Sequence, residues 1–158
     1  MTDLRTEMVQ RIVNSEARRN AQGEILVYDL PTTDGGGTYE VAGVNERYHP
    51  EKAYELRMLV EAGKPVQAER EAREYIAEYT DGAGSISEDT GLSYNLRDCA
   101  WNRGPTGAVK ILQIALKVED DGVFGPISTQ ALNNAMTNVE QLLKDVRAAR
   151  EAYERSRG

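Results

Sequence analysis

The chain has 158 residues, of which 40% are hydrophobic and 28% are charged, and its formal net charge is −7. This composition is typical of a globular protein with a core of its own, and no apolar run reaches the roughly 20 residues that cross a bilayer, so we expect no membrane insertion. The negative charge argues against nucleic acid as a partner, because binding phosphates needs clustered lysine and arginine.

The first predicted element is an amphipathic helix from about Thr2 to Arg19, capped by Thr2 or Asp3. Glu16 continues its apolar stripe, which is formed by Leu4, Met8, Val9, Ile12 and Val13. Partial burial raises the pKa of a glutamate, which suits a general acid. Alternatively, Glu16 is a helix-end residue that pairs with Arg18, Arg19 or a distant arginine.

Two β-strands are predicted next, over 23–30 (GEILVYDL) and 37–44 (GTYEVAGV), because both segments are rich in Ile, Val and Tyr. The connection PTTDGGG contains the Pro, Asp and Gly residues that turns need. We therefore predict a small β-hairpin. Three of its acidic residues are candidates for a second carboxylate opposite Glu16: Asp29, Asp34 and Glu40.

The remainder of the chain is predicted to be mostly helical. Helical patterns cover 50–63, 65–80, 92–102, 106–118 and 138–155, whereas 81–91 is a loop by composition. The order of elements predicts an α+β, mostly helical protein. We expect one domain over 1–158, with a helix-and-hairpin portion over 1–90 and a helical portion over 91–158.

The sequence lacks the residues that most other catalytic mechanisms need. The single histidine, His49, has no second histidine or cysteine close in sequence, whereas a structural zinc site needs about four such ligands. We therefore expect no metal and no cofactor, and a Ser–His or Cys–His mechanism would depend on His49 alone. The single cysteine, Cys99, cannot form an internal disulfide and lies on a stripe with Leu92 and Leu96, which predicts a buried hydrophobic residue. Hydrolysis of a glycosidic bond, in contrast, needs only a carboxylic acid and a carboxylate, or a water held by one.

The segment 102–132 (NRGPTGAVKILQIALKVEDDGVFGPISTQAL) resembles the peptidoglycan-binding segment of glycoside hydrolase family 108. That family has Asn-x-Gly-Pro, a helix with Leu-Gln-x-Ala-Leu, a turn of the form Asp-Gly-x-x-Gly-Pro-x-Thr, and another helix. The matching residues are Asn102, Gly104, Pro105, Leu112, Gln113, Ala115, Leu116, Asp121, Gly122, Gly125, Pro126 and, displaced by one position, Thr129. Alternatively, the segment is a helix–turn–helix corner that completes the fold, since Pro126 suits the first turn of a helix.

The first half is similar to the catalytic part of the same family. The family pattern is a helix ending in Glu-Gly-Gly, followed by Asp-x-Gly-Gly-x-Thr and a Tyr-Gly-Ile-like strand. Here the helix ends in Glu-Ala-Arg, and a longer interval precedes Asp34 and Thr38. The resemblance, which spans 8–135, implies a lysozyme-like fold with a small β-hairpin lobe. It also implies a muramidase that cuts the β-1,4 bond between N-acetylmuramic acid and N-acetylglucosamine.

The resemblance implies Glu16 as the general acid, with Asp34 and Thr38 holding the attacking water. Asp29 and Glu40 remain alternatives to Asp34. Substrate-binding candidates are Tyr28, Tyr39, Glu40 and Trp101, although an aromatic residue at such a position is also explained by packing in the core or at its rim.

The implied partner is bacterial peptidoglycan, and we expect a monomer. The first residues lack the pattern of a signal peptide. We therefore expect synthesis in the cytoplasm and access to the cell wall or periplasm through a holin or a secretion system, as for a phage endolysin or a secretion-associated muramidase. The sequence leaves hydrolysis and lytic transglycosylation both open. A rival hypothesis is a non-catalytic peptidoglycan-binding module on a lysozyme-like frame, which the altered residues after Glu16 and the charge of −7 favour. A structural or adaptor protein is a third.

Overall fold

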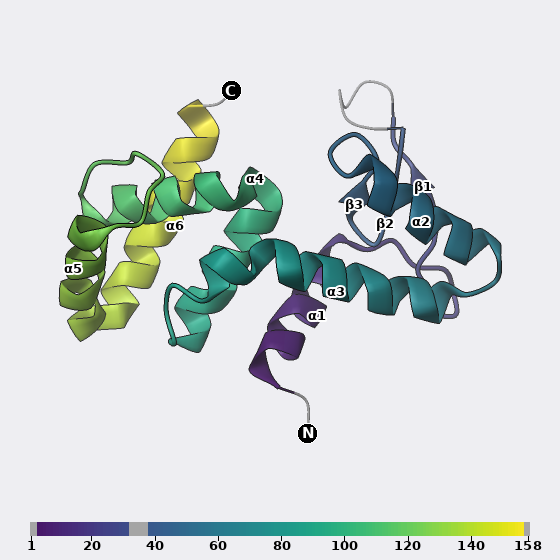
Figure 1. Ribbon diagram of the computed structural model, residues 1–158, viewed down its shortest axis with the longest axis horizontal. Coiled ribbons are helices and arrows are strands. Elements are labelled where there is room, and N and C mark those ends of the chain that lie inside the picture. Colours follow the sequence, from purple (N-terminus) through teal and green to yellow (C-terminus); the bar gives the residue numbers. More distant parts are fainter. Residues whose placement is uncertain (1–2, 32–37, 157–158) are drawn as a thin grey trace. The chain divides into compact units, whose positions relative to one another are not determined.

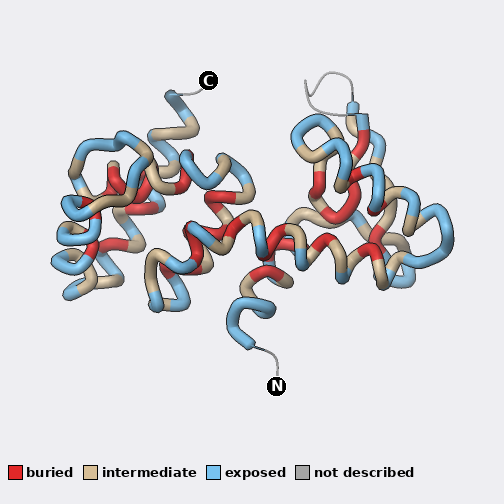
Figure 2. Tube along the Cα trace, viewed as in Figure 1, coloured by how far each residue is buried: buried red, intermediate tan, exposed pale blue. Residues whose placement is uncertain are grey.

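The computed structural model describes residues 3–31 and 38–156 (Figure 1). The chain forms two compact units, Met1–Ala77 and Glu78–Gly158, and buried segments occur in both (Figure 2). The boundary falls within helix α3 (Pro65–Gly84). None of the helices in the described part of the chain is long and apolar enough to cross a membrane. The protein is α+β and mostly helical, as predicted.

The first unit begins with helix α1 (Leu4–Glu16). Of the two predicted caps, Asp3 is the one observed, and its carboxylate accepts a hydrogen bond from the Thr6 backbone N–H at 2.7 Å. The buried face consists of Val9, Ile12 and Val13. The helix ends before the predicted Arg19 because Ala17 adopts an extended conformation (ψ 141°).

A three-stranded antiparallel sheet follows, in the order β1 (Val27–Asp29), β2 (Tyr39–Val41) and β3 (Val44–Asn45). The prediction of one strand over 37–44 is therefore wrong, since this stretch contains a turn at Ala42 and Gly43. Both turn residues have positive φ, 52° and 83°, as expected of a type I′ hairpin turn. The predicted hairpin thus acquires a third strand.

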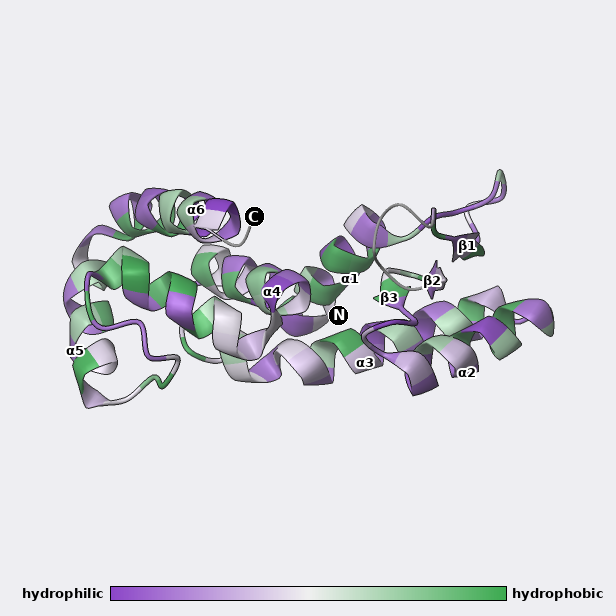
Figure 3. Ribbon diagram, turned by 90° about the horizontal axis from the view of Figure 1, so that it is seen from above, coloured by the Kyte–Doolittle hydropathy of each residue, from purple (hydrophilic) through white to green (hydrophobic). Residues whose placement is uncertain are grey.

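Helix α2 (Pro50–Glu61) and the first part of α3 complete the first unit. Gly63, with φ of 78°, lies between them, which suits the end of a helix. Hydrophobic and hydrophilic residues alternate along both helices (Figure 3), as expected when one face is buried. The buried residues of this face are Ala53, Leu56, Ala68, Ala72 and Ile76. Helix α3 also extends through 81–84, which was predicted to be a loop.

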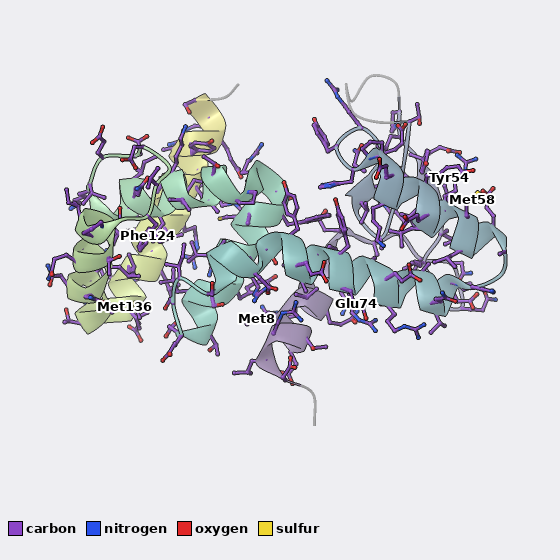
Figure 4. All side chains as sticks on the ribbon, in the orientation of Figure 1. Met8, Tyr54, Met58, Glu74, Phe124 and Met136 are labelled. Carbon is purple, nitrogen blue, oxygen red and sulfur yellow. The ribbon has the colours of Figure 1, made fainter. Side chains whose placement is uncertain are left out.

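The second unit is a helical core built from α4 (Thr90–Leu116), α5 (Pro126–Ala135) and α6 (Val139–Ser156), with a 3-10 turn at Met136–Asn138. The two predicted helices over 92–102 and 106–118 are joined in α4 at a kink, where Gly104 has φ of 81° and Pro105 follows. Cys99 is buried in this core as predicted, and burial raises the pKa of its thiol to about 11. Phe124 and Met136 pack against the core from the two ends of α5 (Figure 4).

Candidate functional site

Glu16 is half-buried at the C-terminal end of α1, where its side chain contacts the turn between β2 and β3. A Cβ atom on Gly43 would lie 2.5 Å from the Cβ atom of Glu16, so this close approach requires a glycine in the turn. The last carbonyl groups of a helix carry partial negative charge. Helix stability therefore does not favour a carboxylate at this position.

Glu40, on β2, is a second half-buried carboxyl group beside Glu16. Burial raises the pKa of Glu40 and the charge of Glu16 raises it further, whereas the charge of Arg18 lowers it. Both burial and a neighbouring carboxylate favour the protonated form of a carboxyl group. The structure therefore brings together two of the predicted site residues in an arrangement that suits acid–base chemistry.

Tyr28 and Arg18 border this carboxyl pair. Tyr28 on β1 is directly opposite Glu40 in the antiparallel register, so the two side chains share one face of the sheet. The Arg18 guanidinium lies 4.5 Å from the centroid of the Tyr28 ring, within cation–π distance. From the sequence, Arg18 was predicted only as a possible ion-pair partner of Glu16. The signal for a larger role was that Arg18 stands where the family pattern Glu-Gly-Gly has its second glycine.

Asp29 and Tyr39 form the next register pair on the same two strands. Because side chains alternate along a strand, these two residues point to the face opposite Glu40. Asp29 is exposed, whereas Tyr39 is only 7% exposed and has the Arg57 guanidinium 4.8 Å from its ring centroid. The structure therefore does not bring Asp29 or Tyr39 together with the carboxyl pair.

The other predicted residues lie in different surroundings. The Thr38 hydroxyl donates a hydrogen bond to Glu46 Oε2 at 3.2 Å. Asp34 lies outside the described residues. Trp101 belongs to the second unit, where its ring meets that of Tyr79 edge to face with centroids 5.4 Å apart.

His49 lines a surface pocket of about 410 Å³ in the first unit. Its Nδ1 atom is 2.6 Å from the Tyr75 hydroxyl, and burial lowers the pKa of the imidazole. Within residues 3–31 and 38–156, no group of three His, Cys, Asp or Glu side chains is placed to hold a metal ion.

The family-like segment of the second unit is organised by Gln113, which is 1% exposed. Its amide nitrogen lies 2.9–3.0 Å from three acceptors, Asp121 Oδ1, Val123 O and Ser128 Oγ. Its side-chain carbonyl oxygen accepts a hydrogen bond from the Gly122 backbone N–H at 2.9 Å. Gln113 therefore ties α4 to the Asp-Gly turn. A cavity of about 230 Å³ lies beside this turn, with Val123 and Ile127 exposed at its edge.

No protein-family model and no curated protein matches this sequence. The resemblance to glycoside hydrolase family 108 therefore remains a prediction, and the function has to be argued from the site itself.

Proposed function

We propose that this protein is a peptidoglycan hydrolase of the muramidase type, with a lysozyme-like fold and membership of glycoside hydrolase family 108. The observation that carries the proposal is the half-buried carboxyl pair Glu16 and Glu40, held where the end of α1 meets the sheet. Cleavage of a glycosidic bond needs one carboxyl group that keeps its proton near neutral pH and one that is ionised. The upward shift of the Glu40 pKa, caused by burial and by the charge of Glu16, favours the protonated form that such a reaction needs.

Residues of the family-like motifs have defined structural roles in the second unit, which supports the proposal. Gly104 and Pro105, from the Asn-x-Gly-Pro motif, form the kink of α4. Gln113, from the Leu-Gln-x-Ala-Leu motif, holds the Asp-Gly turn through its hydrogen bonds. Gln113 thus connects two of the motifs, the Leu-Gln-x-Ala-Leu helix and the Asp-Gly turn.

In the proposed reaction, one member of the pair protonates the glycosidic oxygen as the bond breaks. The resemblance assigns this role to Glu16. Burial and the charge of Glu16 raise the pKa of Glu40, so Glu40 is the alternative proton donor, and we expect both side chains to be required in either assignment. The resemblance gives the attacking water to Asp34 and Thr38, and the hydrogen bond from Thr38 to Glu46 fixes the orientation of the Thr38 hydroxyl.

The proposal is tested by digesting purified peptidoglycan and identifying the released muropeptides by mass spectrometry. We expect reducing muramic-acid ends from the parent protein and at least about 100-fold fewer from Glu16→Gln and Glu40→Gln, because a general acid contributes about 10²–10⁴-fold. Glu24→Gln is the matched control, since Glu24 is an exposed glutamate of the same unit.

Three other results would change the assignment. Anhydro-muramic ends would indicate a lytic transglycosylase. Full activity of both variants would place the chemistry elsewhere. A folded parent that releases no products but sediments with the wall would indicate the non-catalytic binding module.

A further inference from the structure

We propose that Arg18 binds a carboxylate of the substrate, and that this protein therefore selects glycans with a negative charge close to the bond that is cut. The inference rests on the proposed function for the identity of the glycan. The position of Arg18 at the edge of the carboxyl pair is independent of that proposal.

Arg18 is fixed in place at both its backbone and its side chain. Its carbonyl oxygen accepts a hydrogen bond from the Leu26 backbone N–H at 3.0 Å, and its guanidinium lies over the ring of Tyr28. Tyr28 in turn pairs with Glu40 across the sheet. A cation–π contact uses the charge of the guanidinium and not its N–H donors, so these donors can contact a carboxylate in bidentate geometry. Arg18 is also exposed, so a ligand can reach it.

The charges of the molecule explain why the site needs such a cation. The chain has a net charge of −7, and the ionised member of the Glu16–Glu40 pair places part of this negative charge at the proposed point of cleavage. An anionic glycan is repelled by such a surface. The positive charge of Arg18 acts on the same place, since it lowers the pKa of Glu40. Arg18 can therefore offset the repulsion where a substrate carboxylate approaches the reacting groups.

Two parts of peptidoglycan supply the carboxylate chemistry that Arg18 would recognise. One is the lactyl group of muramic acid, which is a free carboxylate in strands without peptides. The other is the stem peptide, which carries carboxylates of its own when it is attached to that lactyl group. An oligosaccharide of N-acetylglucosamine alone has neither, and we expect it to be a poor substrate.

The experiment compares turnover on three substrates: intact peptidoglycan, the same material with its carboxyl groups amidated, and peptide-free glycan strands with free lactyl groups. We expect the parent to cut the material that carries the recognised carboxylate, whether intact peptidoglycan or peptide-free strands, at least about tenfold faster than amidated material. This factor corresponds to the gain of one charge-assisted interaction. Arg18→Gln should lose this preference.

Arg47→Gln is the matched control, because the Arg47 guanidinium also lies over a tyrosine ring, that of Tyr48, at 5.6 Å. Preference for peptide-free strands identifies the lactyl carboxylate as the ligand, and preference for intact material identifies the stem peptide.

A second measurement separates this inference from the proposed hydrolysis. Binding of intact and amidated peptidoglycan is measured by sedimentation in a Glu16→Gln background, with and without Arg18→Gln. Equal binding of intact and amidated material together with equal turnover of all three substrates, or a charge preference that survives Arg18→Gln, overturns the role of Arg18 while hydrolysis stands. Charge-dependent binding that needs Arg18, without any release of products by the parent, supports the role of Arg18 and overturns hydrolysis. Arg18→Lys keeps the charge without the planar fork, and we expect it to retain part of the preference.

Discussion

Gly43 and Glu16 lie so close together that any side chain at Gly43 would collide with the glutamate, since an added Cβ atom would be 2.5 Å from the Cβ of Glu16. The backbone of a hairpin turn thus forms one wall around the proposed catalytic residue. Gly43 also has φ of 83°, a conformation that other residues rarely adopt. One glycine therefore satisfies two requirements, a tight turn and a close contact.

We expect Gly43→Ala to destabilise the protein by about 2–4 kcal/mol, because backbone strain adds to the collision with Glu16. Activity should fall further than the loss of folded protein explains, since the glutamate is displaced. The control is Gly23→Ala, where φ is 81° but nothing lies within 4 Å of the added Cβ. This variant should lose only about 1 kcal/mol and keep its activity. Chemical denaturation and the muropeptide assay measure both effects, and equal behaviour of the two variants would contradict the close contact.

The pKa of Glu40 should respond to changes at both of its charged neighbours. Glu16→Gln removes a negative charge that raises the pKa of Glu40, so the pKa should fall. Arg18→Gln removes a positive charge that lowers it, so the pKa should rise. Titration of the Glu40 carboxyl group by NMR measures both shifts. A Glu40 pKa that neither substitution moves would mean that these side chains are not neighbours in solution.

Glu40 should also make stability depend on pH. Because its pKa is raised in the folded state, the folded protein binds the proton more tightly than the unfolded chain does. Its free energy of unfolding then decreases as pH rises from about 4.3, the ordinary glutamate value, through the raised pKa. We expect Glu40→Gln to lack this decrease, so that the variant gains stability relative to the parent at pH 7 and not at pH 4. Denaturation curves at both pH values provide the test.

His49 should contribute a pH dependence of the opposite sign. Burial lowers the pKa of His49 in the folded state, so the unfolded chain binds the proton more readily. The stabilisation is present above about pH 6.5, the ordinary histidine value, and is lost as pH falls below it. His49 is the single histidine of the chain, so the difference between the parent and His49→Asn isolates its contribution. A difference in unfolding free energy that stays constant from pH 7.5 to 5, two values chosen to bracket the transition, would contradict the burial of the imidazole.

Gln113 should be among the most sensitive positions of the second unit. Gln113→Leu fits the same space but leaves several polar groups of the Asp-Gly turn without their partner. We expect a loss of about 3 kcal/mol or more. Gln130→Leu is the control, because Gln130 is exposed and its amide bonds to Asn134 on the same helix. It should change stability by less than about 0.5 kcal/mol. Similar losses for both variants would show that the Gln113 network adds little.

Much of the helical structure could be predicted from local sequence. Each signal lies within one or two helical turns of the feature that it predicts. Examples are the apolar stripe of α1, the Asp3 cap, and the prolines that begin α2 and α3. The kink at Gly104 is also a local signal, although we expected it to separate two helices. The single strand predicted over 37–44 was wrong because a high content of Ile, Val and Tyr indicates strands but does not locate a turn. Alanine also rarely adopts positive φ, so Ala42 gave no signal of the turn.

The sequence by itself determined the fold class and the buried faces of the helices. It also singled out Glu16 as a candidate acid, because each of these features depends on spacing along the chain. Only the tertiary structure placed Glu40 beside Glu16, since strand register puts Glu40 on the face of Tyr28 and turns Asp29 away. The roles of Gly43 and Arg18 likewise depend on contacts between segments that local patterns do not encode. The site is therefore a property of how the end of α1 packs against the sheet.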